Sequence, residues 1–456
     1  YGEDPFLTSR LGVAFVQGLQ GNHPDYLKVV ATPKHFAVHS GPEGMRHSFN
    51  AVVSRKDLHE TYLPAFKACV QEGKAASVMS AYNALNGEPC SANVELLQHI
   101  LRDEWGFDGY VVSDCGAIGD IYKNHHKARN YPDAAARAVQ AGCDLNCGSV
   151  YKHLKKAVAG GLVSEETIHK SVQRLLEARL QLGMFDDPEK VPYNKISPEI
   201  IDCPEHRALA LEASCRSMVL LKNDGALPLS KENKKIAVIG PNADSLDVLL
   251  GNYNGTPSSY ITALQGIRTY FNGGTVFTQG CDLKRKDKSG FGEALQLAQD
   301  VDAVVLCLGL SPRLEGEEGD ALNADASGDK LSLKLPGAQE ELLELLAATG
   351  KPLIVALFAG SPLDLRKVDQ LANAVIQAWY PGQDGGKALA EILFGDFNPS
   401  GRLPVTFVRS DEDLPPFEDY SMKGRTYRYL DKPPLYPFGF GLSYTSFEYS
   451  DFVLDD

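Results

Sequence analysis

The run "GYVVSDCGAI" (109–118) changes character abruptly at Asp114. The positions before it are largely aromatic or β-branched, which suits the interior of a pleated strand. A carboxylate directly after such a run needs a polar partner or a function, because burying it alone is costly. We therefore predict a strand whose carboxyl end presents Asp114 to a pocket; an Asp that caps the next helix is the alternative.

Similar runs recur on both sides of this strand, separated by helical patterns. Strands are predicted at 27–33, 76–82, 109–114 and 141–146, and helices from Ser54 to about residue 70, at 94–106 and at 164–183. Alternation of this kind is typical of a parallel α/β domain. Three of the strand runs end in polar residues able to bind or react, as the strands of an eight-stranded barrel do at its active face, which favours a barrel over an open sheet.

A second alternation follows a proline-rich segment. Strands are predicted at 235–240, 274–279, 303–310, 352–358 and 374–379, with helices at 336–350 and 385–395. This pattern predicts an open sheet covered by helices on both faces.

Composition excludes several classes of protein. The 456 residues are 43% hydrophobic and carry 45 Lys plus Arg against 59 Asp plus Glu, a net charge of −14. Nucleic acid is therefore an unexpected partner, and no apolar run approaches the roughly 18 residues of a membrane span. Of nine cysteines, only Cys143 and Cys147 are close in sequence, and we interpret them as ordinary buried thiols.

The strand ends supply the candidate site residues. Lys34 and His35 carry hydrogen-bond donors suited to sugar hydroxyls or phosphates, and Tyr82 is placed to bond a carboxylate on the next strand. Met79 lies on the same strand as Tyr82. A structural role is the alternative for Lys34 and His35, and core packing is the alternative for Met79 and Tyr82.

A long acidic segment, "SPRLEGEEGDALNADASGDK" (311–330), follows the strand at 303–310. Loops of this length inside a domain are usually functional or disordered. Its spacing does not match a calcium-binding loop, so we do not expect a metal. A solvated acidic loop is the alternative.

Two further patterns are weak evidence for a functional site. "KIAVIGPNAD" (235–244) lacks the glycine spacing of nucleotide-binding loops, although a nucleotide-binding protein stays a third hypothesis. His125 and His126 are expected to be solvated.

Taken together, these motifs resemble glycoside hydrolase family 3 along almost the whole chain. The landmarks occur in the order "YGEDP" (1–5), "KHF" (34–36), "VMSAYNALNG" (78–87), "WGFDGYVVSD" (105–114), "SMVLLKNDGALPL" (217–229), "GDKLSLKLPGAQ" (328–339), "AWYPGQDGGKALAEILFGDFNPSGRLPVTF" (378–407) and "YPFGFGLSYTSF" (436–447).

The resemblance implies an α/β fold with several parts. These are part of a (β/α)8 barrel at 1–188, a linker at 189–208, an α/β sandwich at 209–408, and a connector with the beginning of a fibronectin type III-like domain at 409–456. Family members have further barrel strands before "YGEDP", so the chain is expected to be N-terminally truncated, with an exposed sheet edge. Activity of the chain alone is then doubtful.

The resemblance also implies roles for particular residues. Asp114 matches the catalytic nucleophile, and Glu315 of the acidic segment is expected to be the acid/base, with Glu317 and Glu318 left open. Retaining glycosidases use two such carboxylates about 5 to 5.5 Å apart, one ionised and one protonated. Lys34 would favour ionised Asp114, and neighbouring carboxylates would favour protonated Glu315. Lys34, His35, Arg46, Met79 and Tyr82 match sugar-binding positions.

The expected activity is exo-acting hydrolysis of terminal β-linked sugars without a cofactor. Cys115 after the nucleophile and "GMRHSFNA" (44–51) resemble the β-xylosidase branch, so xylo-oligosaccharides are the expected substrate. A β-glucosidase, or a non-catalytic carbohydrate-binding fragment, is the alternative. The family's usual role predicts a periplasmic or secreted location, and the oligomeric state is open.

Overall fold

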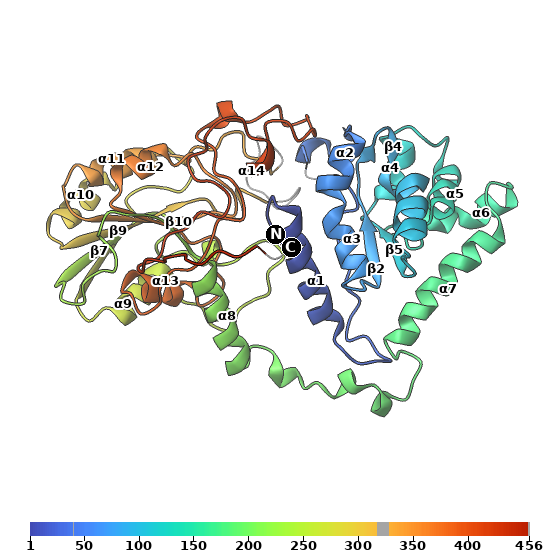
Figure 1. Cartoon of the computed structure of the whole chain (residues 1–456), viewed down its shortest axis with the longest axis horizontal. Coiled ribbons are helices and arrows are strands. Elements are labelled where there is room, and N and C mark those ends of the chain that lie inside the picture. The colour runs from blue at the N-terminus through green and yellow to red at the C-terminus, as the bar shows by residue number, and fades with distance from the viewer. Residues whose placement is uncertain (40, 317–327, 455–456) are drawn as a thin grey trace. The chain divides into compact units, whose positions relative to one another are not determined.

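The computed structural model describes residues 1–39, 41–316 and 328–454, which fall into two compact units. Unit 1 comprises Tyr1–Ser197 and Pro415–Tyr429, and unit 2 comprises Pro198–Leu414 and Leu430–Asp456 (Figure 1). Each unit is described by itself.

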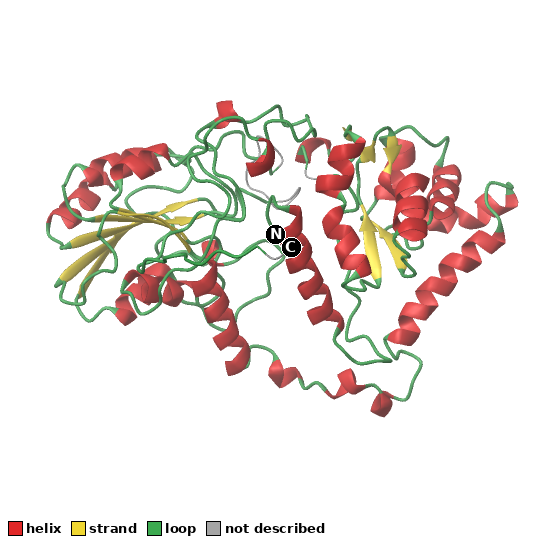
Figure 2. Cartoon of the chain, in the orientation of Figure 1, coloured by secondary structure: helices red, strands yellow, loops and turns green. Residues whose placement is uncertain are grey.

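Unit 1 combines short strands with many helices (Figure 2). Its strands are β1 (Asn50–Ala51), β2 (Ser77–Ser80), β3 (Ala84–Leu85), β4 (Glu88–Pro89) and β5 (Tyr110–Ser113). Its helices are α1 (Pro5–Gln20), η1 (Glu43–Met45), α2 (Arg55–Asp57), η2 (Leu58–Tyr62), α3 (Pro64–Gln71), η3 (Cys90–Ala92), η4 (Glu95–Glu104), α4 (Ala117–Lys123), α5 (Tyr131–Ala141), η5 (Val150–His153), α6 (Leu154–Ala159), α7 (Glu165–Gln181), η6 (Pro188–Lys190), η7 (Pro192–Lys195) and α14 (Thr426–Tyr429).

The centre of unit 1 is a parallel sheet built around β2 and β5. Val78 pairs with Val111, and single parallel bridges from Phe36 to β2 and from Leu145 to β5 extend the sheet on both sides. Each flanking segment therefore pairs through one bridge, over a shorter length than the strands predicted at 27–33 and 141–146. Pro33 has no N–H to donate, and the N–H groups of residues 144 and 145 share one acceptor, the Val111 carbonyl, which interrupts the ladder.

This arrangement establishes the α/β class. The four segments form an open parallel sheet within the described residues, and no closed barrel is formed by them. The partial barrel and the fibronectin-like beginning therefore stay predictions.

The helix signals in the sequence correspond to real caps. Ser54 accepts a hydrogen bond from the Asp57 N–H, and Ser164 caps α7 by accepting from the Thr167 N–H. The helix predicted at 94–106 is η4, wound as a π-helix. Across the ranges that the structure describes, no helix is both long and apolar enough to cross a membrane.

Unit 2 contains a six-stranded sheet in the order β6-β11-β10-β9-β7-β8, parallel except for the edge strand β6. Its strands are β6 (Val219–Asn223), β7 (Lys235–Ile239), β8 (Gly274–Thr278), β9 (Ala303–Gly309), β10 (Leu353–Phe358) and β11 (Ala374–Gln377). Its helices are η8 (Pro198–Ile200), α8 (Pro204–Ser217), η9 (Asp247–Leu249), α9 (Ala263–Tyr270), α10 (Phe291–Gln299), α11 (Gln339–Ala347), α12 (Arg366–Leu371), α13 (Gly385–Leu393) and η10 (Asp411–Asp413).

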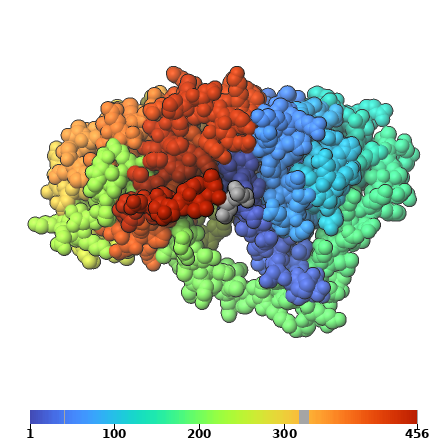
Figure 3. Space-filling view, viewed as in Figure 1, coloured from blue at the N-terminus to red at the C-terminus, as the bar shows by residue number. Residues whose placement is uncertain are grey.

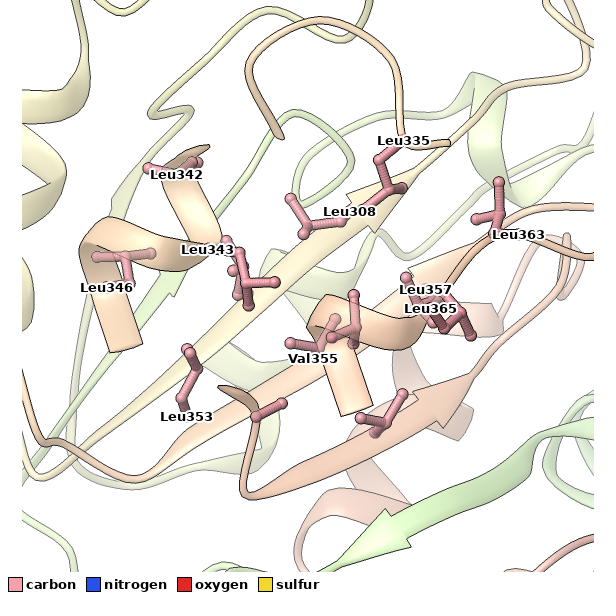
Figure 4. Close-up of a cluster of buried hydrophobic side chains, with 14 of the residues drawn as sticks. Leu308, Leu335, Leu342, Leu343, Leu346, Leu353, Val355, Leu357, Leu363 and Leu365 are labelled. Carbon is pink, nitrogen blue, oxygen red and sulfur yellow. The ribbon is translucent and has the colours of Figure 1, made fainter. Parts of the chain in front are cut away.

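Helices cover both faces of this sheet, as predicted (Figure 1). Because side chains alternate along a strand, one set packs against α10, α11 and α12 and the other against α9 and α13. Figure 4 shows the first set, in which Leu342, Leu343 and Leu346 of α11 lie over Leu308 and Val355. The parallel strands direct their carboxyl ends to one edge, where the loop after β9 carries Glu315.

Candidate active site

Asp114 follows β5 directly and is held by the backbone around it. Its N–H donates to the Ser80 carbonyl at the end of β2 (3.1 Å), and its Oδ1 accepts from the Cys115 N–H (2.8 Å). Oδ2 lies 3.1 Å from Nε2 of His35. Asp114 is 8% exposed, so one carboxylate oxygen is fixed by the backbone and the other meets an imidazole.

The surroundings of Asp114 keep it ionised. Burial opposes the charge, but contact with His35, the Cys115 N–H and the charge of Lys34 outweigh it, so the pKa of Asp114 lies below its ordinary value. His35 in turn meets the ring of His39 edge-on, at 4.9 Å between centroids. Burial, followed by the nearby His35, lowers the pKa of His39 to about 4, so His39 is neutral at neutral pH.

Tyr82 is the second fixed element of the site. Its hydroxyl donates to the Cys115 carbonyl (2.8 Å), and Asp114 is also among its hydrogen-bonding neighbours. The Arg46 guanidinium lies 4.5 Å from the centre of its ring, and the His47 ring meets it edge-on at 4.6 Å. His125 donates to the Tyr82 carbonyl (2.8 Å) and is half-buried, so the expectation that it is solvated is wrong.

Two polar residues that the sequence analysis did not single out contact this cluster. Glu43 pairs with Arg46 across one helical turn, and His47 lies 2.7 Å from the Asp120 carboxylate. Glu43 and His47 lie close to Arg46 in "GPEGMRHSFNA" (41–51). This segment has no helical or strand periodicity that would have marked them as site residues.

Cys147 is wrongly predicted to be a free thiol. It forms a disulfide with Cys115, whose Cα lies 4.5 Å away although 32 positions separate the two in sequence. Pairing of Val112 with Leu145 brings the two chain segments together. Cys143 is a buried free thiol, as expected.

A groove of about 740 Å³ lies elsewhere in unit 1 and does not include Asp114. It is lined by α1, α3, residues 31–34 and residues 417–426. Side chains of α1 form part of the visible surface, dark blue in Figure 3, and Phe15 is 57% exposed. The groove borders the outer edge of the unit 1 sheet, where residues 31–34 include the sugar-binding candidate Lys34.

Glu315 belongs to unit 2, where loops after three neighbouring strands surround its carboxylate. Oε2 accepts from the Gly360 N–H (2.9 Å) and from the Tyr380 hydroxyl, and Oε1 accepts from the Ser361 hydroxyl. These donors follow β10 and β11, and Glu315 follows β9. The carboxylate is therefore fixed rather than freely solvated. Glu317 and Glu318 lie outside the described residues.

The structure thus places the predicted residues in two groups. His35, Asp114, Arg46 and Tyr82 form one connected cluster in unit 1, joined by ring contacts and by the Cys115 backbone. Lys34 acts on Asp114 through its charge. Met79 is half-buried in β2 and pairs with Val112 of β5. Ser361 and Tyr380 were not identified from the sequence as partners of Glu315, although Tyr380 lies in the landmark "AWYPGQ".

Comparison with known proteins gives matches along both units. Residues 1–178 match the glycosyl hydrolase family 3 N terminal domain, and residues 218–444 match the glycosyl hydrolase family 3 C-terminal domain. A xylan 1,4-beta-xylosidase of Xylanibacter ruminicola is 36% identical over 98% of this chain and 69% of its own length.

Two solved structures have the same fold. A GH3 exo-beta-xylosidase in complex with a xylobiose aziridine probe is 36% identical, with a TM-score of 0.91 over 98% of this chain. A beta-glucosidase from Listeria innocua in complex with isofagomine is 33% identical, with a TM-score of 0.85. The chain spans 59% and 63% of these two proteins. Because the two domains of this family match residues 1–178 and 218–444, which together make up most of the chain, the chain belongs to glycosyl hydrolase family 3.

Proposed function

We propose that the chain provides the catalytic residues of a retaining exo-acting β-glycosidase that releases terminal non-reducing β-linked sugars. The observation that carries this proposal is the state of Asp114. Its carboxylate is buried at the end of β5 with a lowered pKa, one oxygen fixed by an N–H and the other beside His35. A nucleophile in this reaction has to be ionised and held rigidly.

The chemistry requires two carboxylates in different roles. An oxygen of Asp114 bonds to the anomeric carbon while the glycosidic bond breaks, and the leaving oxygen takes a proton from the acid/base. In the second step a water molecule gives one of its own protons to the acid/base carboxylate, and its oxygen bonds to the anomeric carbon as the bond to Asp114 breaks and the sugar is released. No metal or organic cofactor takes part.

Glu315 is our proposed acid/base. Its donors, Gly360, Ser361 and Tyr380, hold the carboxylate in one orientation, which supports a role at a defined place in the reaction. Glu317 and Glu318 of the same acidic segment are the alternatives.

Lys34, His35, Arg46, Met79 and Tyr82 are the proposed sugar-binding residues. Lysine, histidine and arginine supply donors for sugar hydroxyls, and Tyr82 and Met79 supply apolar contact area. Arg46 is buried against the Tyr82 ring, which supports a fixed rather than a mobile guanidinium.

We propose β-xylosides, in particular short xylo-oligosaccharides, as the substrates. The Xylanibacter relative is named for xylan, and one solved relative carries a xylobiose-derived probe. β-Glucosides are the second candidate, because the Listeria relative of the same fold is named a beta-glucosidase.

The disulfide supports a periplasmic or secreted location. Disulfides persist in oxidising compartments and are rare in the cytosol of most organisms, and Cys115–Cys147 lies directly beside the proposed nucleophile.

The test of the nucleophile uses the full-length natural protein with nitrophenyl β-xyloside and β-glucoside. We expect Asp114→Ala to lower kcat by more than about 10³-fold on both substrates, while sugar binding measured by calorimetry persists. Cleavage by the variant at the wild-type rate would reject the assignment, and binding without cleavage by the wild type would point to a carbohydrate-binding protein.

The test of the acid/base compares Ala variants at 315, 317 and 318. Loss of the proton donor slows substrates with poor leaving groups most, and azide restores turnover of activated substrates by attacking the glycosyl-enzyme. We expect both signatures in Glu315→Ala alone; their appearance in Glu317→Ala or Glu318→Ala would transfer the role to that residue.

A further inference from the structure

Asp144 is a buried carboxylate that the proposed chemistry does not use. Its side chain has no exposed surface, and each of its oxygens accepts two hydrogen bonds. Oδ2 accepts from Arg102 (2.8 Å) and from the backbone N–H of Val111 (2.9 Å). Oδ1 accepts from the Ser171 hydroxyl (2.8 Å) and from Arg174 (2.8 Å).

The network is not explained by stability alone. Desolvation of charged groups offsets most of the gain from pairing them, so a buried ion pair contributes little more than apolar packing of the same volume. Burial lowers the pKa of Arg102 to about 10, although the negative charge of Asp144 opposes this change. Desolvation of the guanidinium thus outweighs its pairing with Asp144. The network therefore matters mainly because its hydrogen bonds fix the position of the neighbouring backbone.

The network holds the start of β5. Arg102 donates to the carbonyls of Gly109 (3.0 Å) and Phe107 (3.3 Å), which precede the strand. Asp144 binds Val111 twice, because its carboxylate accepts from the Val111 N–H and its own N–H donates to the Val111 carbonyl (2.8 Å). The register of the strand is thereby set from its first residues.

The residues that follow Asp144 hold the end of the same strand. The Ser113 N–H donates to the Leu145 carbonyl (2.8 Å), and the Gly116 N–H donates to the Cys147 carbonyl (2.8 Å). The Cys147 N–H donates to the Ser113 hydroxyl (3.1 Å). Asp114 lies between these attachment points, so its position follows that of segment 144–147.

We propose that Asp144 is a positioning residue for the nucleophile. Together with Arg102, Ser171 and Arg174, Asp144 fixes the position of β5 and therefore the position of the Asp114 carboxylate. The inference rests on the proposed role of Asp114. Reaction rates fall steeply with small displacements of a reacting atom, about 10²-fold for about 1 Å, so loss of the network is expected to slow bond formation more than sugar binding.

The experiment measures bond formation to Asp114 directly, in the full-length natural protein. With 2,4-dinitrophenyl 2-deoxy-2-fluoro-β-xyloside, an Asp114 oxygen bonds to the anomeric carbon as dinitrophenolate leaves with the bonding electrons, and the fluorine slows the subsequent hydrolysis. We expect Asp144→Asn to lower the maximal inactivation rate at least about tenfold, with the inhibition constant within about threefold of wild type, because the sugar-binding side chains remain.

The matched control is Val163→Ala. Val163 is buried in a separate cluster with residues of α5 and α6, so the variant is expected to lower the unfolding temperature without changing the inactivation rate of the folded protein. Ser171→Ala removes one donor to Asp144 without changing charge, and is expected to give a smaller decrease of the same kind.

The outcomes separate the two proposals. Unchanged inactivation rates in folded Asp144→Asn and Ser171→Ala overturn the positioning role, and Ser171→Ala decides alone if Asp144→Asn does not fold. Rates that fall equally in Val163→Ala also overturn it, because the effect would then be general. If peptide mapping finds the fluorosugar on a residue other than Asp114, the proposed nucleophile fails instead.

Discussion

At the scale of single residues, the chemistry of Asp114 depends on what its neighbours do to a buried carboxylate. Burial alone would raise its pKa and so disfavour the ionised form. His35, the Cys115 N–H and the charge of Lys34 reverse that effect. An isolated Asp at a strand end would not suffice for a nucleophile.

The first prediction concerns pH. Because His35 stabilises ionised Asp114, His35→Ala is expected to raise the pKa of that carboxyl and to move the acidic limb of the kcat/KM profile to higher pH. Lys34→Met should move it in the same direction by less. Profiles on nitrophenyl β-xyloside check this, and an acidic limb unmoved in both variants would contradict the assigned cause.

The second prediction concerns Glu315. Tyr380→Phe removes one donor to its carboxylate, and a lost hydrogen bond of about 0.5–1.5 kcal/mol corresponds to a decrease in kcat of about 2- to 12-fold. Tyr444→Phe is the control, since its hydroxyl donates to the Ile392 carbonyl in the same unit. Equal kcat values for the two variants would show that Glu315 does not need this donor.

At the scale of elements, β5 is braced along its length by segment 144–147. Bonds from residues 144 and 145 hold its backbone, and the Cys115–Cys147 disulfide closes the loop just beyond it. The small residues after Asp114 therefore belong to a fixed turn.

The third prediction concerns this disulfide. By the chain-entropy model, closing a loop of 32 residues stabilises the folded state by roughly 3–4 kcal/mol. The double variant Cys115→Ala/Cys147→Ala should lose about that amount in urea unfolding of unit 1, and reductant should destabilise only the wild type. Cys143→Ala is the control for removing a nearby thiol. A wild-type midpoint that reductant does not change would refute the prediction.

At the scale of the molecule, each unit has its own core and is assembled from two stretches of chain. Residues 415–429 belong to unit 1 although more than 200 residues of unit 2 separate them from the rest of it. Tyr420 packs in the unit 1 core, its hydroxyl donates to the Gly41 carbonyl, and its carbonyl accepts from the Tyr62 hydroxyl (2.7 Å).

The fourth prediction follows from this return of the chain. Tyr420→Ala is expected to cost about 3–5 kcal/mol in the unfolding of unit 1, whereas Tyr420→Phe keeps the packing and should cost about 1 kcal/mol. Calorimetry of the full-length protein checks which transition moves. A shift confined to the transition that also responds to Leu357→Ala, in the core of unit 2, would contradict the assignment.

Local patterns predicted much of the fold. Apolar runs located β2, β5, β7, β8, β9, β10 and β11, and the serine caps located α2 and α7, because each depends on residues within one turn or one strand. The edge strand β6 and the return of residues 415–429 were not predicted, since both depend on contacts between distant parts of the chain.

The α/β class, the family and the position of Asp114 and Glu315 after the carboxyl ends of strands follow from the amino-acid sequence, because strand periodicity and ordered motifs are local properties. The tertiary structure was needed to show that Cys147 pairs with Cys115, that Tyr82 donates to a backbone carbonyl and that Asp144 contacts the backbone of β5. These depend on which segments become neighbours in a sheet, and that is set by packing over long separations.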